Sequence, residues 1–474
     1  MSFLEKLLAV NHTVNTIAWV YILLGCVFVG GIFLTVRCKF LQFRKLGYIL
    51  RNTLGRLFEK NQAGEGAVTP FQAVTTALAA TVGTGSIVGT CQAIAMGGYG
   101  AVFWMWMAAL LGMIVKFSEV TLAVRFRQRD KAGDWVGGPM YYIENGMGKK
   151  WHWLAVSYAV LGAVASFGVG NLSQANSIAG SVIVAVQAFM PMSAEAVTVA
   201  NWCIGLVLAV LTALSLFGGI KRIGAVTEKL VPVMSVLYLV FTLTVLLGNI
   251  TRIGDCFVKI FAAAFAPKAV LGGAAGIALK EAVVWGLRRS AFSNEAGLGS
   301  AAIAHAASDT KSPVEQGFYG IFEVFLTTIV ICTLTALTVI VSDVPVAFGV
   351  KPGTELVTAA FATVFGQKLA SLFVAVAIIF FAFSTILGWA LYGARCAQFL
   401  FGTKGYKAYQ VLFVLVVVLG AVASLDVVWD LADTFNGLMA IPNFIALFAL
   451  SGTVAKMVQE HFSKDPLPPI AQNK

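Results

Sequence analysis

The stretch that decides the fold is "ATVGTGSIVGT" at residues 80–90, which lies inside a long apolar run that Pro70 opens and Gly97 and Gly98 close. Glycine in a helix interior costs about 1 kcal/mol relative to alanine. Small residues here are consistent with close packing against a neighbouring helix. They are also consistent with an interrupted helix whose free backbone groups face a ligand. The rest of the chain has to decide between these two interpretations.

The composition is that of a polytopic membrane protein. Hydrophobic residues make up 59% of the 474 residues and charged residues only 12%, whereas soluble proteins average about half apolar and a quarter charged. The seven cysteines are scattered and form no C-x-x-C pair, so neither a disulfide framework nor a zinc site is indicated. No G-x-x-x-x-G-K-[ST] motif occurs, which argues against ATP as the energy source. We expect no resident cofactor.

Apolar segments of spanning length predict about eleven transmembrane helices. A basic segment at 39–58 alternates apolar and cationic residues at helical spacing and predicts an amphipathic helix on the membrane surface; a second, shorter one is expected at 256–265. The predicted spans are 17–36, 69–96, 100–124, 152–189, 199–218, 229–249, 276–306, 316–342, 369–400, 407–425 and 428–453.

The distribution of basic residues predicts the topology. If the loop after the first span is cytoplasmic, 23 of the 33 Lys and Arg residues fall in cytoplasmic segments and 6 in external ones. This asymmetry follows the positive-inside rule. It places the N-terminus outside and the C-terminus in the cytoplasm, and it explains the net charge of +11 without nucleic acid. The expected surroundings are membrane lipid, in a cell (plasma or inner) membrane crossed many times.

Spans 2–6 and 7–11 share a layout, which is typical of an inverted-repeat secondary transporter. Each set opens with a glycine-interrupted helix, the second through "SNEAGLGSA" at 293–301. Two such segments at matching positions point to a binding site near the membrane midplane and favour the interrupted helix. The predicted units are 1–68 (N-terminal span and amphipathic helix), 69–249 (first repeat), 250–453 (second, inverted repeat) and 454–474 (cytoplasmic tail).

Several long motifs together resemble the alanine/glycine:cation symporter family, also described as sodium:alanine symporters or amino acid carrier proteins. They are "VGTGSIVG" (82–89), "GAVFWMWMAALLGMIVKFSE" (100–119), "GGPMYYIENG" (137–146), "FGVGNLSQANS" (167–177) and "RRSAFSNEAGLGSAAIAHAA" (288–307). One position departs from the family pattern, which usually reads G-T-G-N where this chain has Ser86. Serine offers a single hydroxyl where asparagine offers a carbonyl and an amide.

The resemblance implies an all-α membrane protein with the LeuT-type five-plus-five inverted repeat and one extra N-terminal helix. It also implies sodium-driven import of small neutral amino acids, alanine or glycine with glutamine or serine as further candidates, by alternating access. Proton coupling is a variant in related carriers. The chain would then be no enzyme, in keeping with four dispersed histidines and the absence of an H-E-x-x-H motif. A channel is the other rival. Substrate preference, ion stoichiometry and oligomeric state are left open by the sequence.

An amino-acid zwitterion needs donors for its carboxylate and acceptors for its ammonium. Free backbone N–H groups at the first interruption, near a helix N-terminus, supply donors, and polar side chains of the fourth and seventh spans supply further contacts. Bulky aromatic residues near the two interruptions would limit the size of the side chain. The predicted substrate-binding residues are Thr84, Gly85, Ser86, Gln174, Phe292, Asn294, Thr385 and Trp389.

Sodium is a hard ion and prefers oxygen ligands. Ser384 and Thr385 form a hydroxyl pair in the middle of the ninth span, where such groups more often bond the carbonyl four residues back. The resemblance implies that this pair faces the first interruption. A five-oxygen sodium site would then consist of the Ser384 and Thr385 hydroxyls and the backbone carbonyls of Ala79, Val82 and Phe381.

Charged residues within spans are costly and are treated first as functional candidates. Lys116 and Glu119 are three residues apart on the third span and are expected to pair or to reach the membrane surface. Arg288, Arg289 and Glu295 flank or occupy the second interruption and are candidates for gate pairs. His305 is expected to be a polar residue at a helix end, with a proton relay as the alternative.

Overall fold

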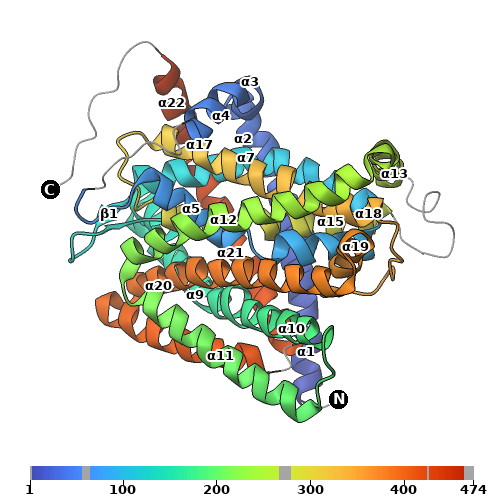
Figure 1. The fold of residues 1–474 in the computed structure, drawn as a ribbon. Coiled ribbons are helices and arrows are strands. Elements are labelled where there is room, and N and C mark those ends of the chain that lie inside the picture. The colour runs from blue at the N-terminus through green and yellow to red at the C-terminus, as the bar shows by residue number, and fades with distance from the viewer. Residues whose placement is uncertain (1–2, 56–63, 266–278, 424–425, 464–474) are drawn as a thin grey trace.

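The structure is a computed structural model that describes residues 3–55, 64–265, 279–423 and 426–463, and it is almost entirely helical (Figure 1). The one exception in these ranges, apart from loops, is a short antiparallel ribbon of β1 (Gln128–Arg129) and β2 (Trp135–Val136). The predicted all-α class is therefore confirmed.

Seven helices in the described ranges are long and apolar enough to cross a membrane. The first of these, Ala9–Arg37, consists of α1 (Phe3–Thr16), η1 (Ile17–Leu23) and α2 (Leu24–Arg37). The others are α7 (Gly100–Arg125), α9 (His152–Phe167) continued by η5 (Gly168–Leu172) and α10 (Ser173–Gln187), α11 (Ala194–Leu216), α12 (Gly219–Gly248), α17 (Pro313–Val324) continued by η8 (Phe325–Cys332) and α18 (Thr333–Val341), and α20 (Gln367–Val422).

The first glycine-rich stretch interrupts a helix. α5 (Pro70–Thr81) starts with a capping box between Thr69 and Gln72 and carries Pro70 in its first turn, which are standard start signals. It ends at Val82, and the chain resumes as η2 (Gly85–Gly89) and α6 (Thr90–Gly97) after a bend of 51°. We call residues 82–84 the first break.

The second glycine-rich stretch interrupts another helix. α15 (Leu279–Asn294) stops before Glu295, which has a positive φ of 56°, and the short helix α16 (Ala302–His305) follows. Gly297 and Gly299 have φ values of 94° and 73°, a region that only glycine enters without strain. We call residues 295–301 the second break. Both interruptions predicted from glycine placement are present.

Several boundaries differ from the expected ones. α12 starts at Gly219, about ten residues before the predicted span, because the polar residues there are good helix formers. α20 runs through 56 residues but turns at Gly402, whose φ is 69°, between the predicted ninth and tenth spans. α22 (Ser451–Phe462) extends into the predicted tail. The number of eleven spans, the inverted repeat and the unit boundaries stay predictions.

The two predicted amphipathic segments are helical where the structure describes them. The first contains α3 (Leu41–Arg44) and α4 (Leu46–Leu54), and its last residues, 56–58, lie outside the described ranges. The second is α13 (Ile253–Phe265).

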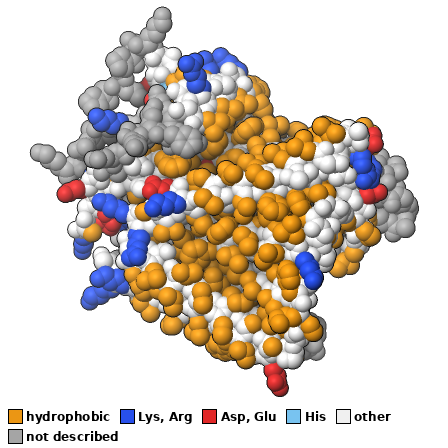
Figure 2. Space-filling view, in the orientation of Figure 1, with side chains coloured by type: hydrophobic (Ala, Val, Ile, Leu, Met, Phe, Trp, Pro, Cys, Tyr) orange, Lys and Arg blue, Asp and Glu red, His pale blue; other side chains and the backbone are white. Residues whose placement is uncertain are grey.

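The surface is divided in the way a membrane requires. Figure 2 shows a broad hydrophobic area over the middle of the molecule, with Lys and Arg gathered toward the end that carries β1 in Figure 1. α11 carries the exposed apolar residues Trp202, Leu206 and Val210. The other end carries α13, α19 (Glu355–Phe365) and the start of α1. The chain is therefore a multi-pass membrane protein.

The interrupted helix α5 lies at the centre of the molecule. All its residues from Ala73 to Thr81 are buried, and it packs against α12 and α20, while α15 packs against α7 and α6. α11, by contrast, packs against α20, α10 and α12 and leaves apolar side chains exposed.

Candidate functional site

The residues directly after the first break lie against the end of α15, just before the second break. A Cβ added at Gly85 would lie 2.9 Å from Cδ1 of the Phe292 ring and 3.6 Å from Cα of Ser293. The hydroxyls of Ser86 and Ser293 are 3.0 Å apart. Glycine at position 85 is thus needed for the approach of η2 to the end of α15.

Ser86 is held in a network that its residue type alone did not reveal. Ser293 is 3.2 Å from the Cys332 thiol, and the Ser86 carbonyl accepts hydrogen bonds from Thr90 at 2.9 Å and Thr335 at 3.1 Å. Sequence reasoning placed Ser293 in the second glycine-rich motif but gave no signal for Cys332 and Thr335, which come from η8 and α18.

Gln174 lies beside the first break, as the substrate assignment requires. The Thr84 hydroxyl donates to Gln174 Oε1 at 3.0 Å, and Gln174 Nε2 donates to the Val169 carbonyl at 2.9 Å. The Ser86 N–H donates to the Gly83 carbonyl at 3.1 Å and is taken. Among the described residues, no backbone hydrogen bond outside the regular helices is formed by the N–H groups of Gly83, Thr84 or Gly85. Thr84 and Gly85 also line a cavity, which is consistent with their predicted part in substrate binding.

Four of the five oxygens assigned to sodium converge. Ser384 Oγ lies 3.0 Å from the Ala79 carbonyl oxygen and 2.9 Å from that of Phe381. Thr385 Oγ1 lies 3.1 Å and 2.9 Å from the same two oxygens. Ala79 precedes the break by one turn, and its usual partner amide belongs to Gly83, outside α5. The break therefore frees the Ala79 carbonyl for the hydroxyls of α20.

The fifth predicted oxygen is the Val82 carbonyl, and the next residue, Gly83, contacts Thr385. Val82 ends α5 with ψ of 72°, and among the described residues no hydrogen bond joins its carbonyl to the hydroxyl pair, so its part in the site stays a prediction. A Cβ at Gly83 would overlap Thr385 Oγ1. Glycine at 83 is thus what lets the first break lie directly against α20.

A cavity of about 320 Å³ leads from the first break toward the end of the molecule that carries α19. Three of the eight predicted substrate residues line it, namely Thr84, Gly85 and Phe292. The other five, Ser86, Gln174, Asn294, Thr385 and Trp389, are not among its lining residues. The remaining lining comes from the outer parts of η2, α6, α10 and α15 and from the segment before α19, and includes Gln92, Asn176, Ser181, Arg289 and Glu355.

Asn294 and Trp389 point elsewhere in this conformation. Asn294 Nδ2 donates to Ser290 at 3.2 Å and to Thr328 at 3.0 Å, so it ties the end of α15 to η8. Trp389 is buried and packs against Gly170, where a Cβ would overlap it. Neither is among the residues that line the cavity, and their contact with substrate stays a prediction.

Lys116 and Glu119 do not pair with each other but both secure the second break. The buried Lys116 ammonium donates to the Asn294 carbonyl at 2.9 Å and lies 3.5 Å from Glu323. Glu119 Oε1 accepts from the N–H groups of Gly297 at 2.9 Å and Gly299 at 3.1 Å. The three-residue spacing placed both groups on one helix face, but the partners were invisible because they lie far away in the sequence.

His305 is the last residue of α16, at a helix end as expected, and it belongs to a buried chain of hydrogen bonds. The Gln316 amide is 2.8 Å from His305 Nδ1, and Gln316 Oε1 accepts from Ser308 at 2.9 Å. An amide nitrogen can only donate, so the network assigns the ring proton to Nε2, which faces Glu323.

The segment that follows α16 is tied to Arg127, which lies between α7 and β1. Arg127 donates to the carbonyls of Ala306 at 3.0 Å, Ser308 at 2.5 Å and Thr310 at 2.8 Å. Burial lowers the pKa of Arg127 to about 10, which still leaves the guanidinium charged at neutral pH. These contacts fix the loop between α16 and α17 against the end of α7.

The candidate gate residues separate into two kinds. Arg288 forms an ion pair with Asp433, and its guanidinium also donates to Asn15 at 3.0 Å. It does not line the cavity. Glu295 receives the Ser300 hydroxyl at 2.5 Å inside the second break. Arg289 alone of these three lines the cavity.

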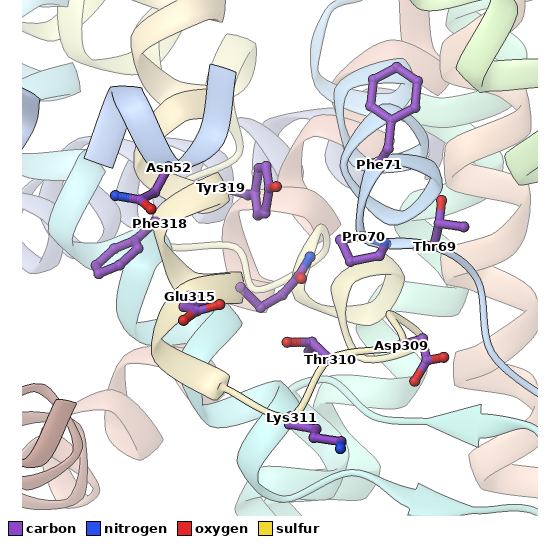
Figure 3. A pocket seen from close by; sticks show the side chains of 11 residues that line it. Asn52, Thr69, Pro70, Phe71, Asp309, Thr310, Lys311, Glu315, Phe318 and Tyr319 are labelled. Atoms are coloured by element: carbon purple, nitrogen blue, oxygen red, sulfur yellow. The ribbon is translucent and has the colours of Figure 1, made fainter. Parts of the chain in front are cut away.

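A second cavity, of about 200 Å³, lies where α4, the start of α5 and the start of α17 meet (Figure 3). Asp309, Thr310 and Lys311 approach it from the loop before α17, and Phe318 and Tyr319 from α17 itself. None of the residues of either break lines it, so it is separate from the site around Thr84.

Comparison with known proteins gives a consistent result. The profile of the Sodium:alanine symporter family matches residues 4–467. The chain is 42% identical over 450 residues to "Sodium/alanine symporter AgcS" of Methanococcus maripaludis, covering 94% of each chain. It is 37% identical over 460 residues to "Probable sodium/glutamine symporter GlnT" of Bacillus subtilis, covering 96% of this chain and 91% of the relative.

The fold is similar to that of a solved LeuT-fold protein. The crystal structure of MhsT in complex with L-phenylalanine matches with a TM-score of 0.58 and 14% identity, over 84% of this chain and 99% of MhsT. At this identity the likeness concerns the fold only. Together with the profile match along nearly the whole length, it leads to one conclusion: the chain belongs to the sodium:alanine symporter family and is a transporter, not an enzyme.

Proposed function

We propose that this transporter is a secondary active symporter that imports small neutral amino acids, alanine and glycine first, together with sodium. The observation that carries the proposal is the convergence of the Ala79 and Phe381 carbonyls with the Ser384 and Thr385 hydroxyls beside the first break. An all-oxygen set without a net charge suits a monovalent hard cation. Such a cation would link α5 to α20 at the place where the substrate also binds.

The surroundings of the first break favour a neutral amino acid. Thr84, Ser86, Gln174 and Ser293 are uncharged and take part in hydrogen bonds there. An acidic or basic substrate side chain would bring an unpaired charge into this buried region, which is strongly unfavourable. Phe292 lies over Gly85 and restricts the size of the side chain. The names of the relatives, with alanine in one and glutamine in the other, are in line with small neutral substrates.

Alternating access is supported by the difference between the two sides of the breaks. The cavity reaches Thr84 and Gly85 from the α19 end. Toward the β1 end, Glu119 bonds the second break, and Lys116 and Arg127 bond the residues just before and after it. With basic residues on the cytoplasmic side, this is an outward-facing conformation in the cell membrane, with the N-terminus outside and the C-terminus in the cytoplasm. Import then requires the contacts on the β1 side to open.

The test is uptake of labelled alanine into proteoliposomes that contain the purified protein. We expect accumulation above the external concentration when an inward sodium gradient is imposed, and none when sodium is equal on both sides. A proton gradient alone is the comparison for the proton-coupled alternative. Uptake that never exceeds equilibration under any ion gradient would refute symport and leave a facilitator or channel.

A further inference from the structure

Arg289 is a buried cation with no hydrogen-bond or ion-pair partner among the described residues. Its side chain is 8% exposed, and among the described residues its guanidinium makes no hydrogen bond or ion pair; Nε is buried and unsatisfied. Its neighbour Arg288, by contrast, is paired with Asp433. A buried charge without an anionic partner in contact is costly, so Arg289 is a candidate for binding an anionic group of a ligand.

The aromatic contacts of Arg289 orient its guanidinium but leave its N–H groups without a hydrogen-bond acceptor. The guanidinium carbon lies 5.2 Å from the centre of the Trp285 ring and 5.5 Å from that of Phe292. Such cation–π contacts stabilise the charge but accept none of its N–H groups in the way a carboxylate does. Arg289 lines the cavity that leads to Thr84, so its hydrogen-bonding capacity is directed toward whatever passes through that cavity.

An acidic group lines the same cavity. Glu355, the first residue of α19, is exposed and accepts the Gly353 N–H at 2.8 Å. No ion pair joins Glu355 to Arg289 in the described structure. The cavity therefore presents one guanidinium and one carboxylate that are not neutralised by each other, above a first break that has no charged side chain.

We propose that this cavity holds an outer binding site for the zwitterionic part of an amino acid, in which Arg289 binds the substrate carboxylate and Glu355 the substrate ammonium. The planar guanidinium matches a carboxylate with two parallel hydrogen bonds. The site rests on the proposed function, because it selects for the α-carboxylate and α-ammonium that all amino acids share. Selection for a small side chain is left to Phe292, one turn further along α15 and at the break itself.

Substitutions in the outer site should change the affinity for alanine without changing sodium binding at the first break. Loss of a hydrogen bond to a charged group lowers affinity about tenfold or more. We expect Arg289→Gln and Glu355→Gln each to raise the alanine concentration for half-maximal uptake by that factor, with maximal rate and sodium half-saturation unchanged. Arg252→Gln is the matched control, because Arg252 pairs with Asp343 at 3.1 Å on the same end of the molecule, outside the cavity.

Inhibition by alaninamide tests whether Arg289 contacts the substrate carboxylate or affects binding only indirectly. It keeps the ammonium but lacks the carboxylate, so it should inhibit the wild type and Arg289→Gln equally and Glu355→Gln more weakly. Equilibrium binding of labelled alanine to purified protein provides a readout that needs no transport. Wild-type protein that binds no amino acid and accumulates none would refute the proposed function, whereas normal wild-type uptake with an unchanged Arg289→Gln would refute the outer site alone.

Two further outcomes would also overturn the outer site. If Arg252→Gln weakens alanine uptake as much as Arg289→Gln, the effect is that of surface charge and no site is needed. If Arg289→Gln lowers the melting temperature of the protein and weakens alaninamide as much as alanine, Arg289 is a structural residue. The outer site requires normal melting together with an effect that depends on the carboxylate.

Discussion

Replacing Thr385 by valine tests the sodium site most directly, because valine keeps the shape of threonine and removes only the hydroxyl. Thr385 Oγ1 lies 3.1 Å from the Ala79 carbonyl oxygen and 2.9 Å from that of Phe381. Ser384 contacts the same two carbonyls, so neither is left without a partner, and we expect the fold to lose only about 1 kcal/mol. Binding of a cation should lose much more, because one of its few oxygen ligands disappears.

The magnitude follows from the cost of losing one contact to a charged group, about 1.5–3 kcal/mol. That corresponds to a rise of roughly 10- to 150-fold in the sodium concentration for half-maximal alanine uptake. Thr385→Ser, which keeps the hydroxyl, should stay near the wild type. Thr242→Val is the control: Thr242 is also buried and its hydroxyl bonds only its own helix, with Tyr238 at 2.8 Å. A sodium half-saturation within twofold of the wild type in Thr385→Val would refute the assignment.

Three other substitutions probe the breaks. Ser86→Asn places two more heavy atoms beside the Ser293 hydroxyl, and we expect the affinity for alanine or sodium to change about tenfold; normal yield with both affinities unmoved would contradict a ligand-facing position. Phe292→Ala removes the ring over the first break and should admit a larger amino acid such as leucine, measured by competition with alanine; loss of alanine uptake without such a gain would argue against the size limit. Glu119→Gln weakens the hydrogen bonds to the second break, including that of Gly297. It should lower the free energy of unfolding by about 1.5–3 kcal/mol, seen as a lower melting temperature, and slow uptake; a variant that melts and transports as the wild type does would exclude this role.

The positions of the glycines predicted the helix interruptions, because glycine is required by the backbone conformation and the free space at its own position. Gly297 and Gly299 adopt backbone angles that other residues avoid, and Gly83 leaves no room for a side chain beside Thr385. These constraints act at the glycine itself and can be read from a single sequence. Hydropathy likewise located most spans, but it missed the first ten residues of α12 because a helix can continue past the apolar segment into polar sequence.

Side-chain partners were predicted less well because they depend on which helices meet. The spacing of Lys116 and Glu119 suggested a pair within α7, whereas their partners, Glu323 and the N–H groups of the second break, come from other helices. The position of the Arg289 guanidinium in a cavity could not be predicted either, because nothing in the sequence distinguishes two adjacent arginines. Only the packing shows that Arg288 meets Asp433 and that Arg289 lines a cavity.

The hydrogen bonds that hold the second break to α7 are stronger than those that hold α5 to α20, so we expect the region around α7 to be more rigid than α5. Lys116 and Glu119 bind the second break to α7 through charge-assisted hydrogen bonds, about twice as strong as neutral ones. Neutral hydroxyls alone connect α5 to α20 at the Ala79 carbonyl. During the transport cycle α7 and α15 should then move as one rigid body, with α5 swinging against them. Substitutions that slow turnover without altering affinity should accordingly gather along α5 and its contact with α20.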